Sequence, residues 1–286
     1  MYLARLSLRV QQTYGKLKMP SIVKHRTALS LFTLLACASQ ASAQTADGAP
    51  AAAAPATTMT ANVTLVSQYV SRGFRQTWGK PALQGGFDIG HPSGFSAGVW
   101  MSTVSNRFIE DGTLEVDLYG GYTGTAGPIG YSALLYYYKY PGAEYQATGT
   151  TYDYGELSLG MTYKFFYAKY NSTYTKEFFG ITNARGTGYL DIGANVDLGS
   201  GYTLNLHAGD GRVDGAGNDI WNWRDVKVGV TKAFEGGWAM SGAYTKARGA
   251  TNAYDAYTLG IPDSSGAIAV SNPAVGTFVV ALTKTF

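Results

Sequence analysis

The sequence predicts an all-β protein, a transmembrane antiparallel β-barrel of about 12 strands with short periplasmic turns and longer extracellular loops. Three observations predict it: a residue period of two, turn signals at regular intervals, and an export signal at the front of the chain. Composition agrees, because only 14% of the 286 residues are charged, against about 25% in an ordinary soluble domain. Mean hydropathy is −0.07, too low for a bundle of membrane helices.

Apolar and polar residues alternate in short runs after Ala61. In residues 190–198, for example, Leu, Ile, Ala, Val and Leu alternate with Asp, Gly, Asn and Asp. Successive side chains of a strand point to opposite faces, so each run has one apolar and one polar face. The predicted strands are 61–74, 81–91, 94–104, 114–125, 129–140, 153–164, 166–178, 187–199, 202–212, 221–234, 237–249 and 274–286.

The connections between these runs alternate in length. Gly- and Pro-rich turns at 91–94, 126–128, 199–201 and 235–237, with a tighter join near Phe165, are short. Longer polar loops are expected near 105–113, 141–152, 179–186, 213–220 and 250–273. Short turns on one rim and long loops on the other are typical of outer-membrane barrels, which places the short turns in the periplasm.

The front of the chain is predicted to be removed on export. Residues 19–43 have a basic segment, a short apolar run and a small-residue site ending at Ala43, the pattern of a secretory signal peptide. Residues 1–18 are then an upstream extension, 44–60 a flexible Ala/Pro/Thr linker, and 61–286 the barrel. The whole chain carries a formal charge of +3. Cleavage removes six basic residues and leaves 16 basic against 19 acidic residues, a net charge of −3.

A soluble sandwich or a lipocalin-like barrel would alternate in the same way, so other features decide for a membrane barrel. The signal peptide exports the chain, and its single Cys37 offers no disulfide to a secreted sandwich. Aromatic residues lie near strand ends, as in the girdles of membrane barrels, although Tyr also favours strands in general. These residues are Trp100, Tyr119, Tyr122, Tyr136, Tyr137, Tyr138, Tyr140, Tyr163, Tyr189, Tyr202, Trp223 and Trp238.

The last predicted strand ends in an aromatic residue. Phe278, Val280 and Leu282 share one face of this strand, and the sequence ends at Phe286. This ending resembles the signal that outer-membrane barrels present to the barrel-insertion machinery. The partners expected from this pattern are therefore outer-membrane lipid and that machinery.

The sequence resembles the TorF family of porin-like proteins, which are predicted outer-membrane barrels of Gram-negative bacteria. The matching segments are YVSRG (69–73), QT (76–77), PALQGG (81–86), SGF (93–95), GVW (98–100), EVDLYGGY (115–122), YYYKYPG (136–142), YGEL (154–157) and TKTF (283–286). The similarity covers most of 61–286 and is specific mainly up to about residue 160. Ser71 and the loop 250–273 depart from the pattern. The resemblance implies a porin-like channel with no assigned solute.

Polar residues on the alternate face of the strands are expected to line the lumen, because a Lys or Arg facing lipid at mid-depth costs about 2–4 kcal/mol. Acids outnumber bases among them, which suggests a weak preference for cations. The same charges could instead pair across the lumen and plug it. The candidates are Arg72, Glu115, Asp117, Glu156, Lys169, Asp191, Asn195, Asp197, His207, Asp225 and Lys227.

Passive diffusion of small solutes or ions through a monomeric or homo-oligomeric barrel is the function predicted. Two alternatives are a non-conducting structural or adhesive barrel that uses loop 250–273, which folds inward or outward, and a barrel lipase or protease. An enzyme would need His207 beside a nucleophile, and no Ser motif indicates one. We predict no catalytic, cofactor-binding or metal-binding residues and no nucleic-acid partner.

Overall fold

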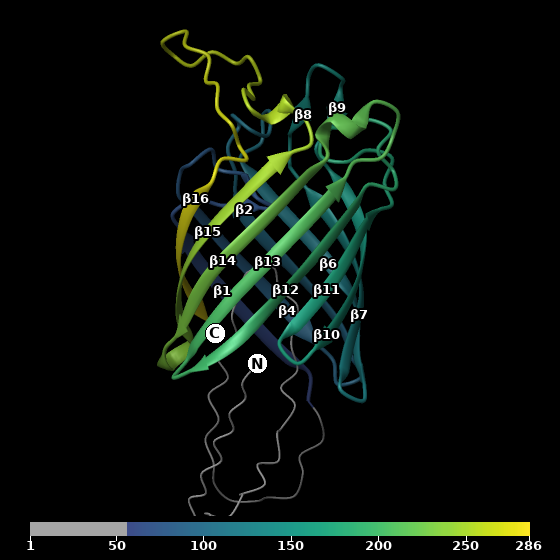
Figure 1. Ribbon diagram of the computed structural model, residues 1–286, viewed down its shortest axis with the longest axis vertical. Helices are drawn as coiled ribbons and strands as arrows, with labels where there is room; N and C mark the ends of the chain where they lie inside the picture. The colour runs from purple at the N-terminus through teal and green to yellow at the C-terminus, as the bar shows by residue number, and fades with distance from the viewer. Residues whose placement is uncertain (1–55) are drawn as a thin grey trace, which may run out of the picture. The chain divides into compact units, whose positions relative to one another are not determined.

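The computed structural model describes residues 56–286, and within them twelve antiparallel strands close into a barrel. Each strand pairs with its neighbours in sequence, and the first strand also pairs with the last (Figure 1). The predicted fold class is confirmed. The barrel strands are β1 Thr58–Val66, β4 Ala82–Gly90, β5 Phe95–Thr103, β6 Leu114–Ala126, β7 Ile129–Lys139, β10 Tyr154–Tyr163, β11 Phe166–Thr173, β12 Gly188–Gly199, β13 Tyr202–Arg212, β14 Trp223–Ala233, β15 Trp238–Gly249 and β16 Thr277–Thr285.

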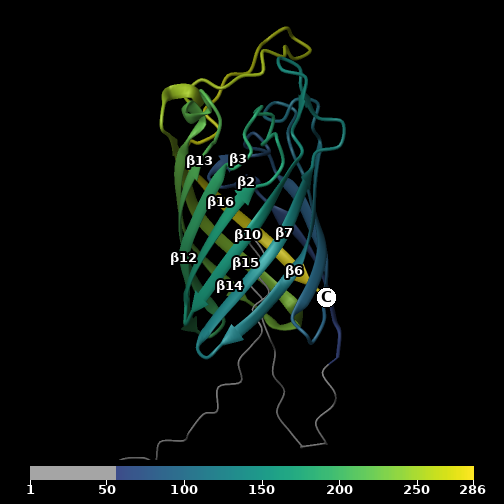
Figure 2. The same ribbon diagram turned by 90° about the vertical axis from the view of Figure 1, so that its right-hand side faces the viewer.

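The strands are joined by short turns at one end, the turn end, and by long connections at the other, the loop end (Figures 1 and 2). Five turns of two to four residues close the turn end, where β1 begins and β16 finishes. Six connections meet at the loop end: 67–81, 104–113, 140–153, 174–187, 213–222 and 250–276. The first of these was not expected as a loop, because the sequence predicted one continuous strand over 61–74.

The connection after β1 folds back as a small hairpin instead of extending the strand. Its strands are β2 (Val70–Ser71) and β3 (Phe74–Arg75), which pair as Ser71↔Phe74. At the tip, φ is 47° for Arg72 and 83° for Gly73, and a type I′ turn needs positive φ at both central residues. The alternation of this segment fits a strand, so the period alone could not locate the reversal at Arg72 and Gly73.

The outer face of the barrel is apolar over most of its height. Along β10, Leu157, Leu159 and Met161 are exposed while Glu156 and Ser158 are buried, as the period of two requires. Exposed rings form a girdle near the turn end. They are Phe95, Tyr131, Tyr163, Phe165, Phe166, Tyr202, Phe234, Trp238 and Phe286. Lys284 lies over the rings of Trp238 and Phe286, where its stem covers apolar surface.

Several rings predicted for the girdles instead face the barrel interior or lie buried at its mouth. Trp223 follows the same face of β14 as Asp225, and its side chain is 4% exposed. The girdle prediction was therefore wrong for these rings, because proximity to a strand end does not specify which face a ring occupies. The corrected residues are Trp100, Tyr119, Tyr136, Tyr138, Tyr140, Tyr189 and Trp223.

The remaining boundaries differ little from the prediction. β1 begins at Thr58, three residues before the predicted start of the barrel, and β11 ends at Thr173 rather than near residue 178. The predicted extension 1–18, the signal peptide 19–43 and the linker up to residue 55 lie outside the described residues. The helices of residues 56–286 are three short 3-10 turns, none long and apolar enough to cross a membrane.

Candidate functional site

The inward faces of the strands form a continuous lining around the barrel. The strand register places Asn205 opposite both Asn195 and Gly229, and His207 opposite both Gly193 and Lys227. Directly opposed residues share a face, so the inward-facing residues of each strand lie beside those of the next strand. Charged residues concentrate on this lining in the half near the loop end, which is also where the β2–β3 hairpin lies.

Arg72 joins the tip of the hairpin to the barrel wall. Its guanidinium donates to both carboxylate oxygens of Glu156 on β10, at 2.9 and 2.5 Å, and Glu156 is 0% exposed. The guanidinium also lies 4.5 Å from the ring centroid of Tyr189 on β12. A fork-to-carboxylate pair fixes orientation as well as charge, so the hairpin tip is held between two strands. The sequence had suggested that Arg72 lies on a wall strand. In the structure Arg72 instead reaches the interior from a loop.

His207 on β13 lies between two carboxylates. Its Nδ1 is 2.8 Å from Asp191 on β12, and its Nε2 is 2.6 Å from Asp225 on β14. Lys169 forms an ion pair with the second oxygen of Asp191 at 2.9 Å, and the Tyr189 hydroxyl donates to Asp225 at 2.9 Å. A carboxylate only accepts, so a ring that bonds to both carboxylates donates from both nitrogens and keeps no lone pair to activate a nucleophile.

A second acidic group lies on β6. Tyr69, at the start of the hairpin loop, donates to Glu115 Oε1 at 3.3 Å. The other oxygen of Glu115 and Oδ1 of Asp117 are buried and have no hydrogen-bond donor among residues 56–286. Glu115 and Asp117 are two residues apart on one strand and so lie on the same face. These acids thus differ from Glu156, Asp191 and Asp225, each of which has a basic partner.

The half of the lining near the turn end is built from smaller and less charged residues. Asn205 donates to Asn195 Oδ1 at 2.8 Å and accepts from Thr231 at 2.8 Å. Asp197 accepts the backbone N–H of Gly199 beside the β12–β13 turn. Other inward positions here are Gly86, Gly98, Gly121, Gly160, Gly193, Gly229, Ser241, Ala243 and Thr283.

The structure brings together residues that sequence reasoning did not select. Tyr69 and Tyr189 contact the predicted acids, and Asp88 near the turn end accepts from the Tyr119 hydroxyl at 2.6 Å. Tyr189 and Asp88 share the inward phase of their strands with predicted or small inward residues, so strict application of the period could have found them. Lys227 lies beside His207 in the register, on the inward face of β14.

Aromatic side chains crowd the loop end and form a structure that we call the ring cage. Each of the six described loops contributes at least one ring to it. Phe74 of the hairpin, for example, lies 4.7 Å from Tyr254 and 5.6 Å from Trp223 between ring centroids. The members are Phe74, Phe108, Tyr140, Tyr145, Tyr152, Tyr154, Phe178, Phe179, Trp221, Trp223, Tyr254 and Tyr257. They surround a cavity of about 260 Å³.

Two of the loop tyrosines of the cage, Tyr152 and Tyr257, are held as neutral phenols. Burial raises the pKa of Tyr152 to about 12 and the pKa of Tyr257 well above its ordinary value. Tyr257 donates to the backbone carbonyl of Phe108 at 3.2 Å, which ties the last loop to the β5–β6 loop. Loop 250–273 therefore packs on the mouth through its base, while its central part projects away from the barrel (Figure 1).

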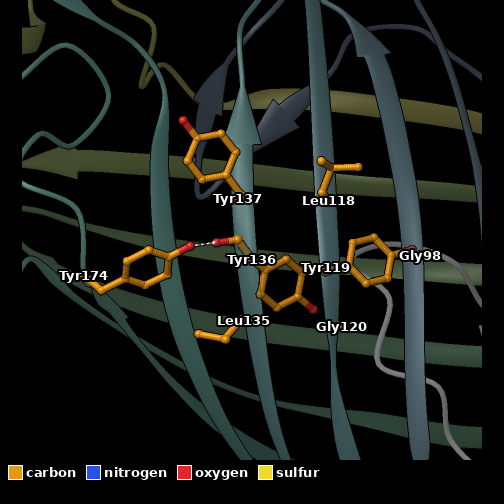
Figure 3. Close-up of a pocket in the computed structure, with 8 residues that line it drawn as sticks. All are labelled: Gly98, Leu118, Tyr119, Gly120, Leu135, Tyr136, Tyr137 and Tyr174. Carbon is orange, nitrogen blue, oxygen red and sulfur yellow. Dashed lines mark hydrogen bonds between the residues drawn. The ribbon is translucent and has the colours of Figure 1, made fainter.

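A shallow notch of about 350 Å³ interrupts the wall between β5, β6 and β7 (Figure 3). Gly120 leaves a gap on the outer face between Leu118 and Leu135. The hydroxyl of Tyr174 donates to the backbone carbonyl of Tyr136 at 3.2 Å. The lining side chains are apolar or phenolic. The notch therefore supplies no charged group for chemistry.

The predicted C-terminal signal residues lie on the outer face of β16. Phe278 is 77% exposed, and Val280, Leu282 and Phe286 are exposed as well. Within residues 56–286 no three His, Cys, Asp or Glu side chains converge as metal ligands.

Comparison with protein families places the chain. The model that matches residues 50–286 is described as a bacterial protein of unknown function (Gcw_chp). The chain belongs to this family. No curated protein matches the sequence. The family match does not extend to the TorF name that the sequence motifs suggested.

Solved structures similar to this Gcw_chp chain are outer-membrane porins and channels. KdgM porin is 6% identical, with a TM-score of 0.50 over 79% of this chain and 99% of that one. An outer-membrane channel from Pseudomonas putida F1 is 13% identical, with a TM-score of 0.42 over 82% and 97%. An anion-selective porin from Comamonas acidovorans is 11% identical, with a TM-score of 0.37 over 81% and 100%. At these identities the likeness concerns the fold, which is that of an outer-membrane barrel.

Proposed function

We propose that the chain is a porin-like channel of the outer membrane that passes small ions and solutes by diffusion and weakly prefers cations. The observation that carries this proposal is the contrast within the lumen: a turn-end half lined by small and polar side chains leads to a loop-end half with larger side chains, where Glu115 and Asp117 have carboxylate oxygens without donors among residues 56–286. Unpaired carboxylate oxygens in a constriction attract cations and repel anions. Exposed apolar residues and the turn-end girdle suit a lipid environment.

Further features of this proposal extend the sequence prediction. The turn end faces the periplasm after export and cleavage near Ala43, and the outer residues of β16 with Phe286 act as the insertion signal. The TorF-like motifs support a porin-like role. Catalysis has no support in the geometry of His207, whose two nitrogens both face carboxylates.

The test is conductance of the refolded protein in a planar bilayer with a salt gradient. We expect discrete conductance steps and a reversal potential on the cation-selective side. Glu115→Gln with Asp117→Asn shifts that potential toward zero, because it removes both carboxyl groups from the lining. The control is Glu235→Gln with Asp219→Asn, which removes the same formal charge from exposed positions outside the lumen. No conductance above background refutes the channel and favours a structural or adhesive barrel, and an anion-selective potential refutes the preference.

A further inference from the structure

The cavity inside the ring cage has the size of a small organic molecule. Its volume of about 260 Å³ lies just below the range of about 300–1,000 Å³ that is usual for small-molecule sites. A small guest, such as a substituted six-membered ring, suits this size. The cavity is lined mainly by residues of the connections at the loop end.

The walls of the cavity suit an aromatic guest. Most neighbouring rings of the cage meet edge to face or tilted, as Phe74 does with Trp223 and Phe178 does with Tyr154 at 4.8 Å, and two pairs are stacked. Such walls present both faces and edges, and an inserted ring gains offset or edge-on contacts with several of them. Saturated rings fill the same space without these contacts.

The charge around the cavity selects a neutral guest. Arg72 is the only charged residue among the described residues that line it. Its guanidinium pairs with both oxygens of Glu156 and lies over the ring of Tyr189, so its charge is already balanced by a carboxylate. No carboxylate lines the cavity to balance a cationic guest.

Two buried polar atoms in the lining have no hydrogen-bond partner among residues 56–286. They are the indole Nε1 of Trp223, a donor, and Oε1 of Gln76, an acceptor. Trp223 is 4% exposed and Gln76 is 5% exposed. An unpaired buried polar group costs about 1–3 kcal/mol, so a guest toward which either side chain turns gains by pairing with it. A hydroxyl group both accepts and donates and can pair with either one.

From these features we infer that the ring cage is a binding site for small, neutral, monocyclic phenols. The ring packs against the aromatic walls, and the hydroxyl pairs with the Trp223 indole or the Gln76 amide. This inference goes beyond the proposed channel, because binding at the mouth requires no conduction.

The experiment measures binding of p-cresol to the refolded full chain by titration calorimetry. Toluene, which lacks the hydroxyl, and 4-methylcyclohexanol, which lacks the aromatic ring, are the matched ligands. We expect p-cresol to bind about fivefold more tightly than toluene, the effect of one hydrogen bond of about 1 kcal/mol. We expect it also to bind more tightly than 4-methylcyclohexanol, which keeps the hydroxyl but loses the contacts between aromatic rings. No p-cresol binding, equal binding of toluene, or tighter binding of tetramethylammonium overturns the inference.

Variants locate the site. Trp223→Phe keeps a ring but removes the donor, and Gln76→Leu keeps the approximate volume but removes the acceptor. We expect at least one of these variants to weaken the binding of p-cresol about fivefold and to leave the binding of toluene unchanged. Trp238→Phe, in the exposed girdle at the turn end, is the control and leaves p-cresol binding unchanged. Unchanged p-cresol binding in both cage variants overturns the assignment, whatever the conductance of the protein.

Discussion

The two halves of the barrel interior are built on the same strands but packed in opposite ways. Near the loop end, the hairpin tip, the Arg72–Glu156 pair and the ring cage fill the space with large and mutually bonded side chains. Near the turn end, inward positions are largely Gly, Ala, Ser, Thr and Asn. The strands alone would make a barrel of one width throughout. The space inside the barrel is thus reduced near the loop end by one inserted loop and by large side chains. Neither depends on the number of strands.

Removing the hairpin tip is the largest expected perturbation of this contrast. Replacing residues 70–75 with Gly and Ser, together with Glu156→Gln to avoid an unpaired buried acid, should raise single-channel conductance several-fold, because the obstruction leaves the lumen. Deleting 258–269, the projecting part of the last loop, is the control and should leave the conductance steps unchanged. Unaltered conductance in the hairpin variant would place the constriction elsewhere.

Breaking the ion pair alone should loosen the narrow half. Glu156→Gln leaves Arg72 buried without a charged partner, and loss of one member of a buried pair costs about 3–5 kcal/mol. We expect that loss in the free energy of unfolding, measured by denaturant titration with tryptophan fluorescence in micelles. Glu177→Gln serves as the matched control, because its pair with Lys176 is largely exposed and contributes about 0–1 kcal/mol. Equal effects of the two variants would mean that the pair does not hold the hairpin.

A bulky probe should distinguish the filled half from the wide half. Ser102 on β5 is 1% exposed in the narrow half, and Ser102→Trp should destabilise the protein by about 1–3 kcal/mol through overpacking. Ser241 on β15 faces the wide half, so Ser241→Trp should lower conductance with little loss of unfolding free energy. Similar destabilisation by both substitutions would contradict a wide turn-end half.

The smallest expected effect concerns the docking of the hairpin against the wall. A Cβ added at Gly73 would lie 2.6 Å from Ala247 Cβ and 2.7 Å from Asp225 Cβ, whereas one at Gly127 meets nothing within 4 Å. Both residues have positive φ, so Gly→Ala strains the backbone at each. Gly73→Ala should therefore cost about 1 kcal/mol more in unfolding free energy than Gly127→Ala. Identical losses would mean that the tip is not packed against β14 and β15.

The sequence predicted the wall of the barrel better than its contents. Alternation such as Leu190–Asp191–Ile192 depends on the local distinction between lipid and lumen, so strand number and most strand ends were predictable. The interior depends on which strands become neighbours. His207 was predicted only as one of several lumen-lining residues, because nothing local shows that the register brings Asp191 and Asp225 to its two sides. The reversal of the chain at Arg72 and Gly73 was missed for a different reason. The residues on either side of it alternate as they would in a strand.

The pairing of β1 with β16 has a consequence for how the molecule is assembled. The register joins Asn62 to Thr285 and Val66 to Ala281, partners more than 200 residues apart, while every other wall contact links strands adjacent along the chain. Closing a loop tenfold longer costs about 2 kcal/mol more in chain entropy. On chain entropy alone, we therefore expect the β1–β16 seam to be the last part of the ring to form on folding. Until it forms, the growing sheet has two free edges, and the order of events during assembly is set by when this one seam closes.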